Sequence, residues 1–377
     1  MNLRRVRAVA RKEFLHVLRD PRSLVMAIFI PMLMLFLFGY ALTLDVDQVP
    51  LVVWDQSGSH ASRELVSRFS GSRYFRLKGY VQSDAESDRA LDTRWAMAVL
   101  VIPPDFPAWI ETGRDAAVQL VVDGSDANTA TIAIGYADFV VQIYSQDVML
   151  NTVHRMGSNP LRTPLEMRPR IWFNTDLESR NYIIPGLIGV IMMVIAALLT
   201  SLTVAREWER GTMEQLISTP VKGKELFLGK LLPYFAIGML DVLLAVLMGE
   251  FLFKVPLRGS VALLFGMAMI FLVGVLSMGM LISIITKSQL LASQVAMVST
   301  FLPSFLLSGF MFAISNMPKP IQVITYIVPA RYFVSLLKGI YLKGVGLEIL
   351  FGEALLLTAY GIVMIFLANV KFKKKLE

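Results

Sequence analysis

The chain has 377 residues, of which 55% are hydrophobic and only 17% are charged, and its mean hydropathy is +0.60. This balance excludes an ordinary soluble protein and an intrinsically disordered one, and the absence of cysteine excludes a disulfide-stabilised scaffold. The formal net charge of +7 would suit nucleic-acid binding if the basic residues formed one patch. They instead flank apolar segments, so we expect a membrane protein with no nucleic-acid partner.

Six apolar segments are long enough to cross a lipid bilayer, which takes about 20 helical residues. The first is 24–44, and its length and its lack of a small-residue cleavage site favour a retained span over a signal peptide. The other five lie within 181–370, at 182–204, 231–253, 261–285, 290–313 and 349–370. The predicted fold class is therefore an α-helical membrane protein with six transmembrane helices.

Residues 45–180 separate the first two spans and are predicted to form a domain of their own. Acidic residues outnumber basic ones there, which is the reverse of the rest of the chain. Strand-like runs at 49–54, 95–102 and 118–122 are each followed by a helix-like run, and 170–173 is a candidate for a last strand. We expect an α/β domain inserted between the first and second spans.

The distribution of Lys and Arg predicts the orientation. Basic residues are concentrated in the segment 1–23, in the loop after the second span and in the tail 371–377, and they are fewer in the loops on the opposite side. Short cytoplasmic flanks of membrane helices carry an excess of Lys and Arg. We therefore expect both termini in the cytoplasm and the domain 45–180 on the extracytoplasmic (periplasmic) side.

Motifs for catalysis or for metal binding are not evident. A phosphate-binding loop requires Ser or Thr after its Gly-Lys pair, but Lys224 is followed by Glu and Lys230 by Leu. The three histidines are scattered and there is no thiol to complete a metal site. We expect no catalytic residue, no metal, no cofactor and no ATPase activity in this chain.

The cytoplasmic loop 205–222 carries the most informative pattern. Thr212 and Gln215 have the spacing of a capping box, the apolar residues 213, 216 and 217 share one helical face, and Pro220 ends the pattern. This predicts a short amphipathic helix next to a cluster of charged residues. Both a solvated interfacial loop and a docking surface for a cytoplasmic partner fit that composition.

Two motifs carry a resemblance to a known family. The first reads R-E-x-E-R-G-T-x-E-Q-L over 206–216 and is followed by T-P at 219–220. The second comprises N-M-P at 316–318 and V-P-A-R-Y-F at 328–333. With these motifs the chain resembles the permeases of type-2 ABC exporters along its whole length, and it is most similar to their bacterial multidrug-efflux branch, of the Ybh operon type.

The resemblance implies a multi-pass permease of the bacterial inner membrane that moves drugs or other amphipathic substrates outward. Two separate cytoplasmic ABC ATPase subunits would bind ATP and Mg and energise it. It also implies a second permease chain, as a homodimer or as a heterodimer with a sister permease. A periplasmic adaptor and an outer-membrane channel would be further partners.

The resemblance also assigns roles to segments. Segment 1–23 would be a cytoplasmic amphipathic interfacial helix, 205–222 would contain the coupling helix, and 314–346 would be a re-entrant segment on the outer side. The residues that couple to the ATPase would be Glu207, Glu209, Arg210, Gly211, Thr212, Glu214 and Leu216. The residues that shape the re-entrant segment would be Pro318, Pro329, Arg331 and Tyr332.

Asp241 lies about mid-depth in the third span, where an ionisable group suggests a functional site. It would belong to a substrate or ion pathway, or it would be a packed polar group. Met192, Met239 and Met278 would offer an adaptable substrate surface, although methionine is also an ordinary apolar filler. Two other functions stay open: an ion-coupled secondary transporter that uses Asp241, and a membrane-anchored receptor or scaffold whose external domain binds a ligand.

Overall fold

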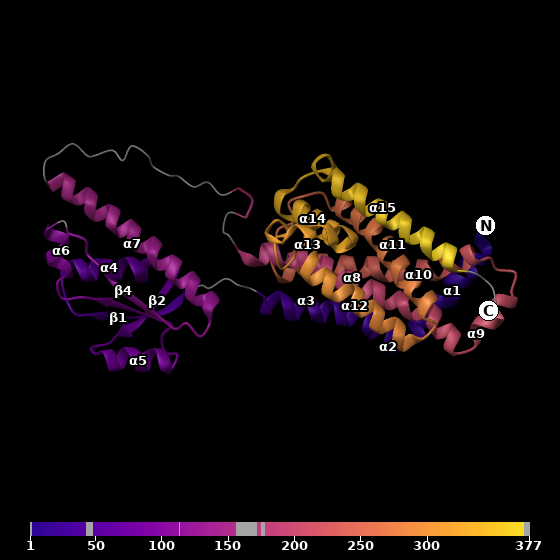
Figure 1. Ribbon diagram of the computed structural model, residues 1–377, viewed down its shortest axis with the longest axis horizontal. Coiled ribbons are helices and arrows are strands. Elements are labelled where there is room, and N and C mark those ends of the chain that lie inside the picture. Colours follow the sequence, from indigo (N-terminus) through magenta and orange to yellow (C-terminus); the bar gives the residue numbers. More distant parts are fainter. Residues whose placement is uncertain (1, 43–47, 113, 156–171, 175–177, 373–377) are drawn as a thin grey trace. The chain divides into compact units, whose positions relative to one another are not determined.

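The structure is a computed structural model that describes residues 2–42, 48–112, 114–155, 172–174 and 178–372 (Figure 1). The chain forms two compact units, Met1–Thr43 with Ile171–Glu377, and Leu44–Arg170. Each unit has a hydrophobic core of its own. The predicted basic tail falls outside the described residues after Phe372.

The unit Leu44–Arg170 is an α/β domain built on a four-stranded sheet. Its strands are β1 (Val49–Asp55), β2 (Phe75–Tyr80), β3 (Ala98–Ile102) and β4 (Gln119–Val122), in the order β2-β1-β3-β4. Strand β1 is parallel to β2 and β3, whereas β4 is antiparallel to β3. The helices are α4 (His60–Gly71), α5 (Asp84–Asp92), α6 (Phe106–Thr112) and α7 (Ala127–Arg155).

Helices cover both faces of the sheet. Leu51 and Val53 pack with Phe69 of α4 and Ala137 of α7 on one face, and Val52 packs with α5 on the other (Figure 1). Because successive side chains of a strand point to opposite faces, a central strand covered on both sides is apolar throughout. The continuous apolar run of β1 is why this strand could be predicted from the sequence.

Strand β2 and helix α5 were not predicted from the sequence. Strand β2 lies at the edge of the sheet, and only its first residue, Phe75, is buried. Helix α5 is short and buries only Ser87 and Ala90. Neither segment therefore shows a clear apolar pattern. The predicted last strand, 170–173, was wrong for its described residues, because Trp172 and Phe173 lie in no strand. Residues 170 and 171 are outside the described residues.

The other unit is helical, and within its described residues five helices are long and apolar enough to cross a membrane. They are α8 (Ser179–Glu209), α10 (Gly223–Leu247) with a π-helical continuation to Leu252, α11 (Val261–Thr286), α12 (Gln289–Leu307) and α15 (Leu347–Lys371). Helix α12 ends before residue 313, where the fifth predicted span ended, because the chain turns at Gly309 with a φ of +78°. The chain is thus a multi-pass helical protein.

The first predicted span, 24–44, is shorter than expected. Helix α2 (Pro21–Leu24) leads through the π-helical Val25–Phe29 into α3 (Ile30–Ala41), and the apolar helical stretch Ala27–Ala41 is shorter than the five long helices. A bent pair, Lys319–Ile327 and Pro329–Lys343, would count as one further span if its halves crossed the membrane together. The count of six spans stays a prediction.

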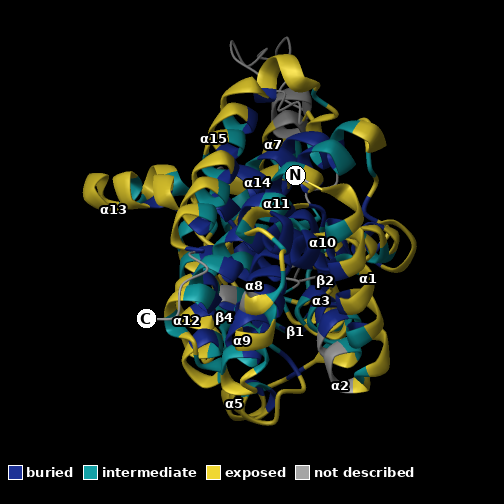
Figure 2. Ribbon diagram, turned by 90° about the vertical axis from the view of Figure 1, so that its right-hand side faces the viewer, coloured by how far each residue is buried: buried dark blue, intermediate teal, exposed yellow. Residues whose placement is uncertain are grey.

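Helix α8 is the centre of the helical unit, as its buried colour in Figure 2 shows. Its most apolar stretch is 89% buried inside the unit, against 22% for α12 and for α15. A helix that is apolar all round belongs in an interior or in lipid. Helix α8 thus packs against protein, whereas α12 and α15 expose apolar side chains on the outside of the unit.

Small residues let α11 approach α8 closely. A Cβ added at Gly279 would overlap Thr200 Oγ1 and the carbonyl oxygen of Ala197, both on α8. Membrane helices often use small residues to bring two backbones together in this way. The α8–α11 contact therefore depends on a glycine at this position.

We expect Gly279→Ala to lower the free energy of unfolding by about 1–3 kcal/mol, because the added methyl group forces two packed backbones apart. Thermal unfolding of the purified chain in detergent measures the change. The matched control is Gly266→Ala on the same helix, where an added Cβ meets nothing within 4 Å. Equal stability of the two variants would contradict the assigned packing.

Candidate functional site

The amino-terminal helix α1 (Leu3–Arg19) packs across the first turns of α10. Its buried residues Val6, Val9, Glu13 and Val17 recur every three or four positions, so they form one helical face. A Cβ at Gly229 of α10 would lie 2.6 Å from Val9 Cβ, so the two helices are in close contact there. One residue of this buried face, Glu13, is charged.

Lys230 of α10 meets that charge. Its side chain is 1% exposed, and its Nζ atom donates a hydrogen bond to Glu13 Oε1 at 2.9 Å. The same Nζ atom lies 3.0 Å from Oε2 of Glu207, which is near the end of α8. Lys12 Nζ donates to the other oxygen, Glu207 Oε1, at 2.8 Å. We call these four residues the Lys230 cluster; it joins α1, α8 and α10.

The charges in the Lys230 cluster stabilise one another. Burial alone would raise the pKa of Glu13, but the ammonium groups of Lys230 and Lys12 outweigh it and hold that pKa below its ordinary value of 4.5. Burial likewise opposes the charge of Lys12, yet its bond to Glu207 raises the pKa of Lys12 above 10.5. The Lys230 cluster thus pairs two basic side chains with two acidic ones.

A second polar contact holds the start of α1. Glu225 Oε1 accepts a hydrogen bond from the backbone N–H of Asn2 at 2.6 Å, and its Oε2 accepts one from the backbone N–H of Lys222 at 3.0 Å. Arg5 Nη1 donates to the carbonyl of Pro220 at 2.5 Å. The start of α1 is thus tied to the first turn of α10 and to the segment that links α8 to α10.

Helix α9 (Thr212–Ser218) lies in that segment and is the predicted coupling helix. Its N-cap is Gly211, whose φ of +69° lets the chain turn immediately after α8. The predicted capping box of Thr212 and Gln215 was wrong. Thr212 is the first residue inside the helix, and its Oγ1 reaches the carbonyl of Glu207 at 3.4 Å.

Some of the predicted coupling residues contact other helices of the unit, and others are exposed. Glu207 belongs to the Lys230 cluster, and Glu209 accepts a hydrogen bond from the backbone N–H of Gln289 at the start of α12, at 2.7 Å. Arg210 and Thr212 border a cavity of about 230 Å³ next to the cluster. Glu214 is exposed on α9, whereas its neighbour Met213 is buried.

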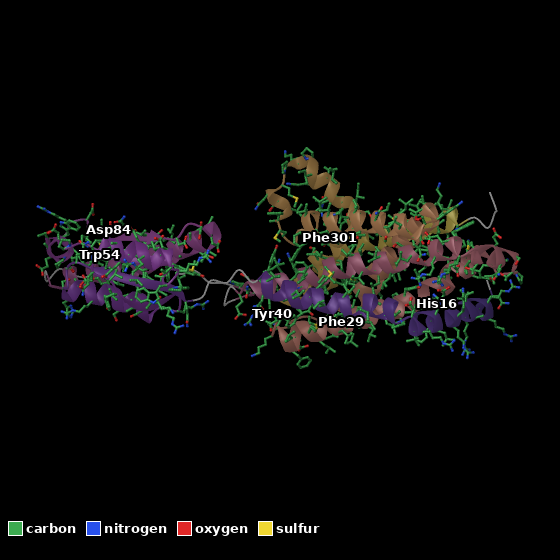
Figure 3. The ribbon with its side chains drawn as sticks, turned by 90° about the horizontal axis from the view of Figure 1, so that it is seen from below. His16, Phe29, Tyr40, Trp54, Asp84 and Phe301 are labelled. Atoms are coloured by element: carbon green, nitrogen blue, oxygen red, sulfur yellow. The ribbon has the colours of Figure 1, made fainter. Side chains whose placement is uncertain are left out.

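Leu216 of α9 is half-buried against the core of the helical unit. Together with Met213 it anchors one face of α9 and leaves the other face exposed to solvent. The exposed face carries Glu214, the one acidic residue of α9. His16 of α1 lies toward the end of the helical unit that carries α9 (Figure 3). Its Nε2 atom is 3.4 Å from Nη1 of Arg206 on α8.

Sequence reasoning missed Glu13 and Lys230. The position of each residue in the sequence could have indicated it. Glu13 interrupts the apolar face of α1, and Lys230 directly precedes the predicted third span. A lone charge in an apolar pattern indicates a buried partner. Which residue is that partner depends on how helices far apart in sequence pack.

Asp241 and the three methionines lie apart from the Lys230 cluster. The Asp241 side chain is buried, and its Oδ1 atom accepts no hydrogen bond from the described residues. Met192 is buried too, Met239 is half-buried, and the sulfur of Met278 accepts a hydrogen bond from Tyr360 at 3.0 Å. The role of these residues in a pathway stays a prediction.

The predicted re-entrant segment contains the bent pair of helices α13 (Lys319–Ile324) and α14 (Pro329–Lys338), whose halves meet at 91°. Pro318 caps α13 and Pro329 begins α14. The guanidinium of Arg331 lies 3.7 Å from the centroid of the Tyr326 ring, and Tyr332 donates a hydrogen bond to the carbonyl of Tyr326 at 2.7 Å. These contacts hold the bend, and α13 is exposed along most of its length (Figure 2).

The long apolar helices are those of a multi-pass membrane protein. The family described as ABC-2 family transporter protein matches residues 21–370. The chain is 40% identical to the "Probable multidrug ABC transporter permease YbhS" of Escherichia coli K12, over 100% of this chain and 99% of that protein. It is 30% identical to the "Probable multidrug ABC transporter permease YbhR" of the same strain, over 93% of each chain. The "Inner membrane transport permease YhhJ" of that strain is 25% identical over 99% of this chain and 98% of its own.

The chain therefore belongs to the ABC-2 transporter family and is the membrane permease subunit of an ABC exporter. The resemblance drawn from the two motifs is confirmed. Membership of this family implies ATPase subunits as partners and a membrane as the working environment.

We expect Lys230→Met to destabilise the helical unit by about 3–5 kcal/mol, because it leaves the carboxylates of Glu13 and Glu207 buried without their shared cation. Denaturant unfolding of the purified chain in detergent measures the change. Lys224→Met on the same helix is the matched control, because Lys224 is exposed and makes no ion pair with the described residues. A loss as large in the control would argue against the Lys230 cluster.

Proposed function

We propose that this permease exports drugs or other amphipathic compounds across the bacterial inner membrane. The proposal follows the names of its relatives, which are called probable multidrug permeases and an inner membrane transport permease. The observation that carries the mechanism is the position of α9. Its exposed face, with Glu214, follows α8 after only two residues, and the end of α8 is tied to α1 and α10 by the Lys230 cluster.

In this proposal α9 is the coupling helix and sits in a groove of an ATPase subunit. Because α9 joins α8 through Arg210 and Gly211 alone, a push on α9 is transmitted to the central helix. The Lys230 cluster makes α1, α8 and α10 move with it as one body. Rigid-body rotation of such helices is an established way to switch between two packed states, here inward and outward access.

The ATPase itself is supplied by other chains. Neither Lys224 nor Lys230 stands in a phosphate-binding motif, and Lys230 is already occupied by two carboxylates. We propose that two ATPase subunits bind ATP and Mg, and that this chain carries no cofactor or enzymatic activity of its own. Glu207, Glu209, Arg210, Gly211 and Thr212 would keep α9 in place, and Glu214 would contact the ATPase.

We further propose that two permease chains form the translocation unit, as a homodimer or with a sister permease. The exposed apolar faces of α12 and α15 leave room for either lipid or a second chain. The α/β domain would stand in the periplasm and meet an adaptor and an outer-membrane channel. Both termini would be cytoplasmic, as the basic flanks predict.

The two alternative functions have weaker support. An ion-coupled transporter would need Asp241 to meet an ion, but in this chain the carboxylate is buried among apolar helices. Such a transporter would keep working when the partner ATPase is inactivated, whereas the proposed exporter would stop. A receptor or scaffold would not need five long membrane helices.

Glu214→Lys should weaken association with the ATPase by roughly tenfold or more, since a reversed charge at an interface costs several kcal/mol. Co-purification of the ATPase with tagged permease measures association, and efflux of a fluorescent dye measures transport. Glu348→Lys, an exposed acid in the first turn of α15, is the control and should leave both unchanged. Full ATPase recovery by Glu214→Lys would reject α9 as the coupling helix.

The orientation can be tested with single cysteines, because the chain has none. Ser70 on α4 and Ser218 on α9 are both exposed. In whole cells with a permeable outer membrane, an impermeant thiol reagent should label Ser70→Cys and spare Ser218→Cys until the cells are opened. The reverse pattern would overturn the proposed orientation.

A further inference from the structure

A cavity of about 770 Å³ lies far from α9 in the helical unit. It is bounded by the end of α12, the bent pair α13–α14 and the first turns of α15. Tyr182 near the start of α8 lines it, whereas Glu207 of the Lys230 cluster lies near the end of α8. At 1.5 Å per helical residue, these two residues are about 38 Å apart along the helix.

Three cationic side chains line this cavity, those of Arg331, Lys338 and Lys343. Within the described part of the chain none of them has a carboxylate within 4.0 Å, although Glu353 also lines the cavity. Lys338 Nζ donates to the carbonyl of Gly309 at 2.8 Å and lies 3.3 Å from the centroid of the Tyr182 ring. These partners are neutral, and the three basic side chains outnumber the one acidic side chain, Glu353, in the lining of the cavity.

Arg331 is held in place and keeps donors free. Its Nη1 atom donates to Gln322 O at 3.2 Å and to Thr325 Oγ1, and its guanidinium stacks on Tyr326. Its Nε and Nη2 atoms make no hydrogen bond with the described residues. Such a fixed planar fork suits two oxygens of one phosphate group.

The part of the cavity that belongs to α15 is mostly apolar, and Glu353 is the one charged residue there. Ile349 and Leu356 line the cavity and are 71% and 43% exposed. They lie on a candidate membrane span whose neighbouring apolar residues are also exposed. A ligand with a charged head would thus find an apolar track for its tail along α15.

We propose that this cavity binds the phosphate headgroup of an acidic membrane lipid, with Arg331, Lys338 and Lys343 facing the phosphate and the acyl chains lying along α15. Basic pockets between membrane helices bind lipid headgroups, and tyrosines such as Tyr182 and Tyr326 are enriched where membrane helices meet the headgroup region. The site is separate from the proposed export of drugs and from the contact with the ATPase. Its occupant would be a resident lipid of the membrane rather than a free ion.

Native mass spectrometry of the purified full chain in detergent tests this site, by titration with phosphatidylglycerol and with phosphatidylcholine of the same acyl chains. We expect phosphatidylglycerol to bind at least fivefold more tightly. Lys343→Gln should remove most of this preference. Lys343 is exposed, and among the described residues its only aromatic contact is the Phe173 ring at 6.0 Å, so the substitution should not disturb folding. Arg331→Gln should remove it as well.

Lys319→Gln is the control, because Lys319 is an exposed cation of the same bent pair that does not line the cavity. It should keep the preference for phosphatidylglycerol. Equal binding of the two lipids to the wild-type chain would overturn the proposal, and so would an equal loss in Lys319→Gln and Lys343→Gln. Glycerol phosphate tests the source of the ligand: if it displaces phosphatidylglycerol at equal concentration, the site takes a soluble phosphate ester and the lipid assignment fails.

Discussion

The ammonium group of Lys230, almost fully buried between two carboxylates, is the contact on which the organisation of the helical unit depends. A buried charge is costly unless partners of opposite charge surround it, and here the partners come from α1 and α8. The three helices can separate only by exposing or stranding these charges. The cluster thus favours one arrangement of α1, α8 and α10, which apolar packing alone would leave less specific.

This arrangement connects the small helix α9 to the centre of the molecule. Helix α9 follows α8 through one left-handed glycine, and α8 in turn is the most buried of the long helices. Glycines bring α11 close to α8 and α10 close to α1, so the two helices of each pair are tightly packed. Helix α9 is therefore joined to the helical core by a short connection and by closely packed helices.

Within its described residues, the α/β domain is stabilised by a hydrophobic core of its own and not by buried charges between helices. Its sheet is covered on both faces by helices of the same unit, so its core is complete without the membrane helices. Strands β1 and β3 were predictable because central strands are apolar over their whole length. Edge strand β2 and helix α5 were not, because each buries few residues and their neighbours supply most of the apolar contact.

The membrane class, the approximate positions of the long helices, the location of the α/β domain along the chain and the family could all be predicted from the sequence, because apolar length and contiguous motifs are local properties. The same local motif places Glu207 and Glu214 in one short segment. Helix packing was needed to show that Glu207 turns inward to Lys230 while Glu214 faces solvent, that Gly211 rather than Thr212 caps α9, and that Arg331, Lys338 and Lys343 share one cavity. These outcomes depend on side chains brought together from distant helices, and helix packing, unlike helix formation, is not a local property of the chain.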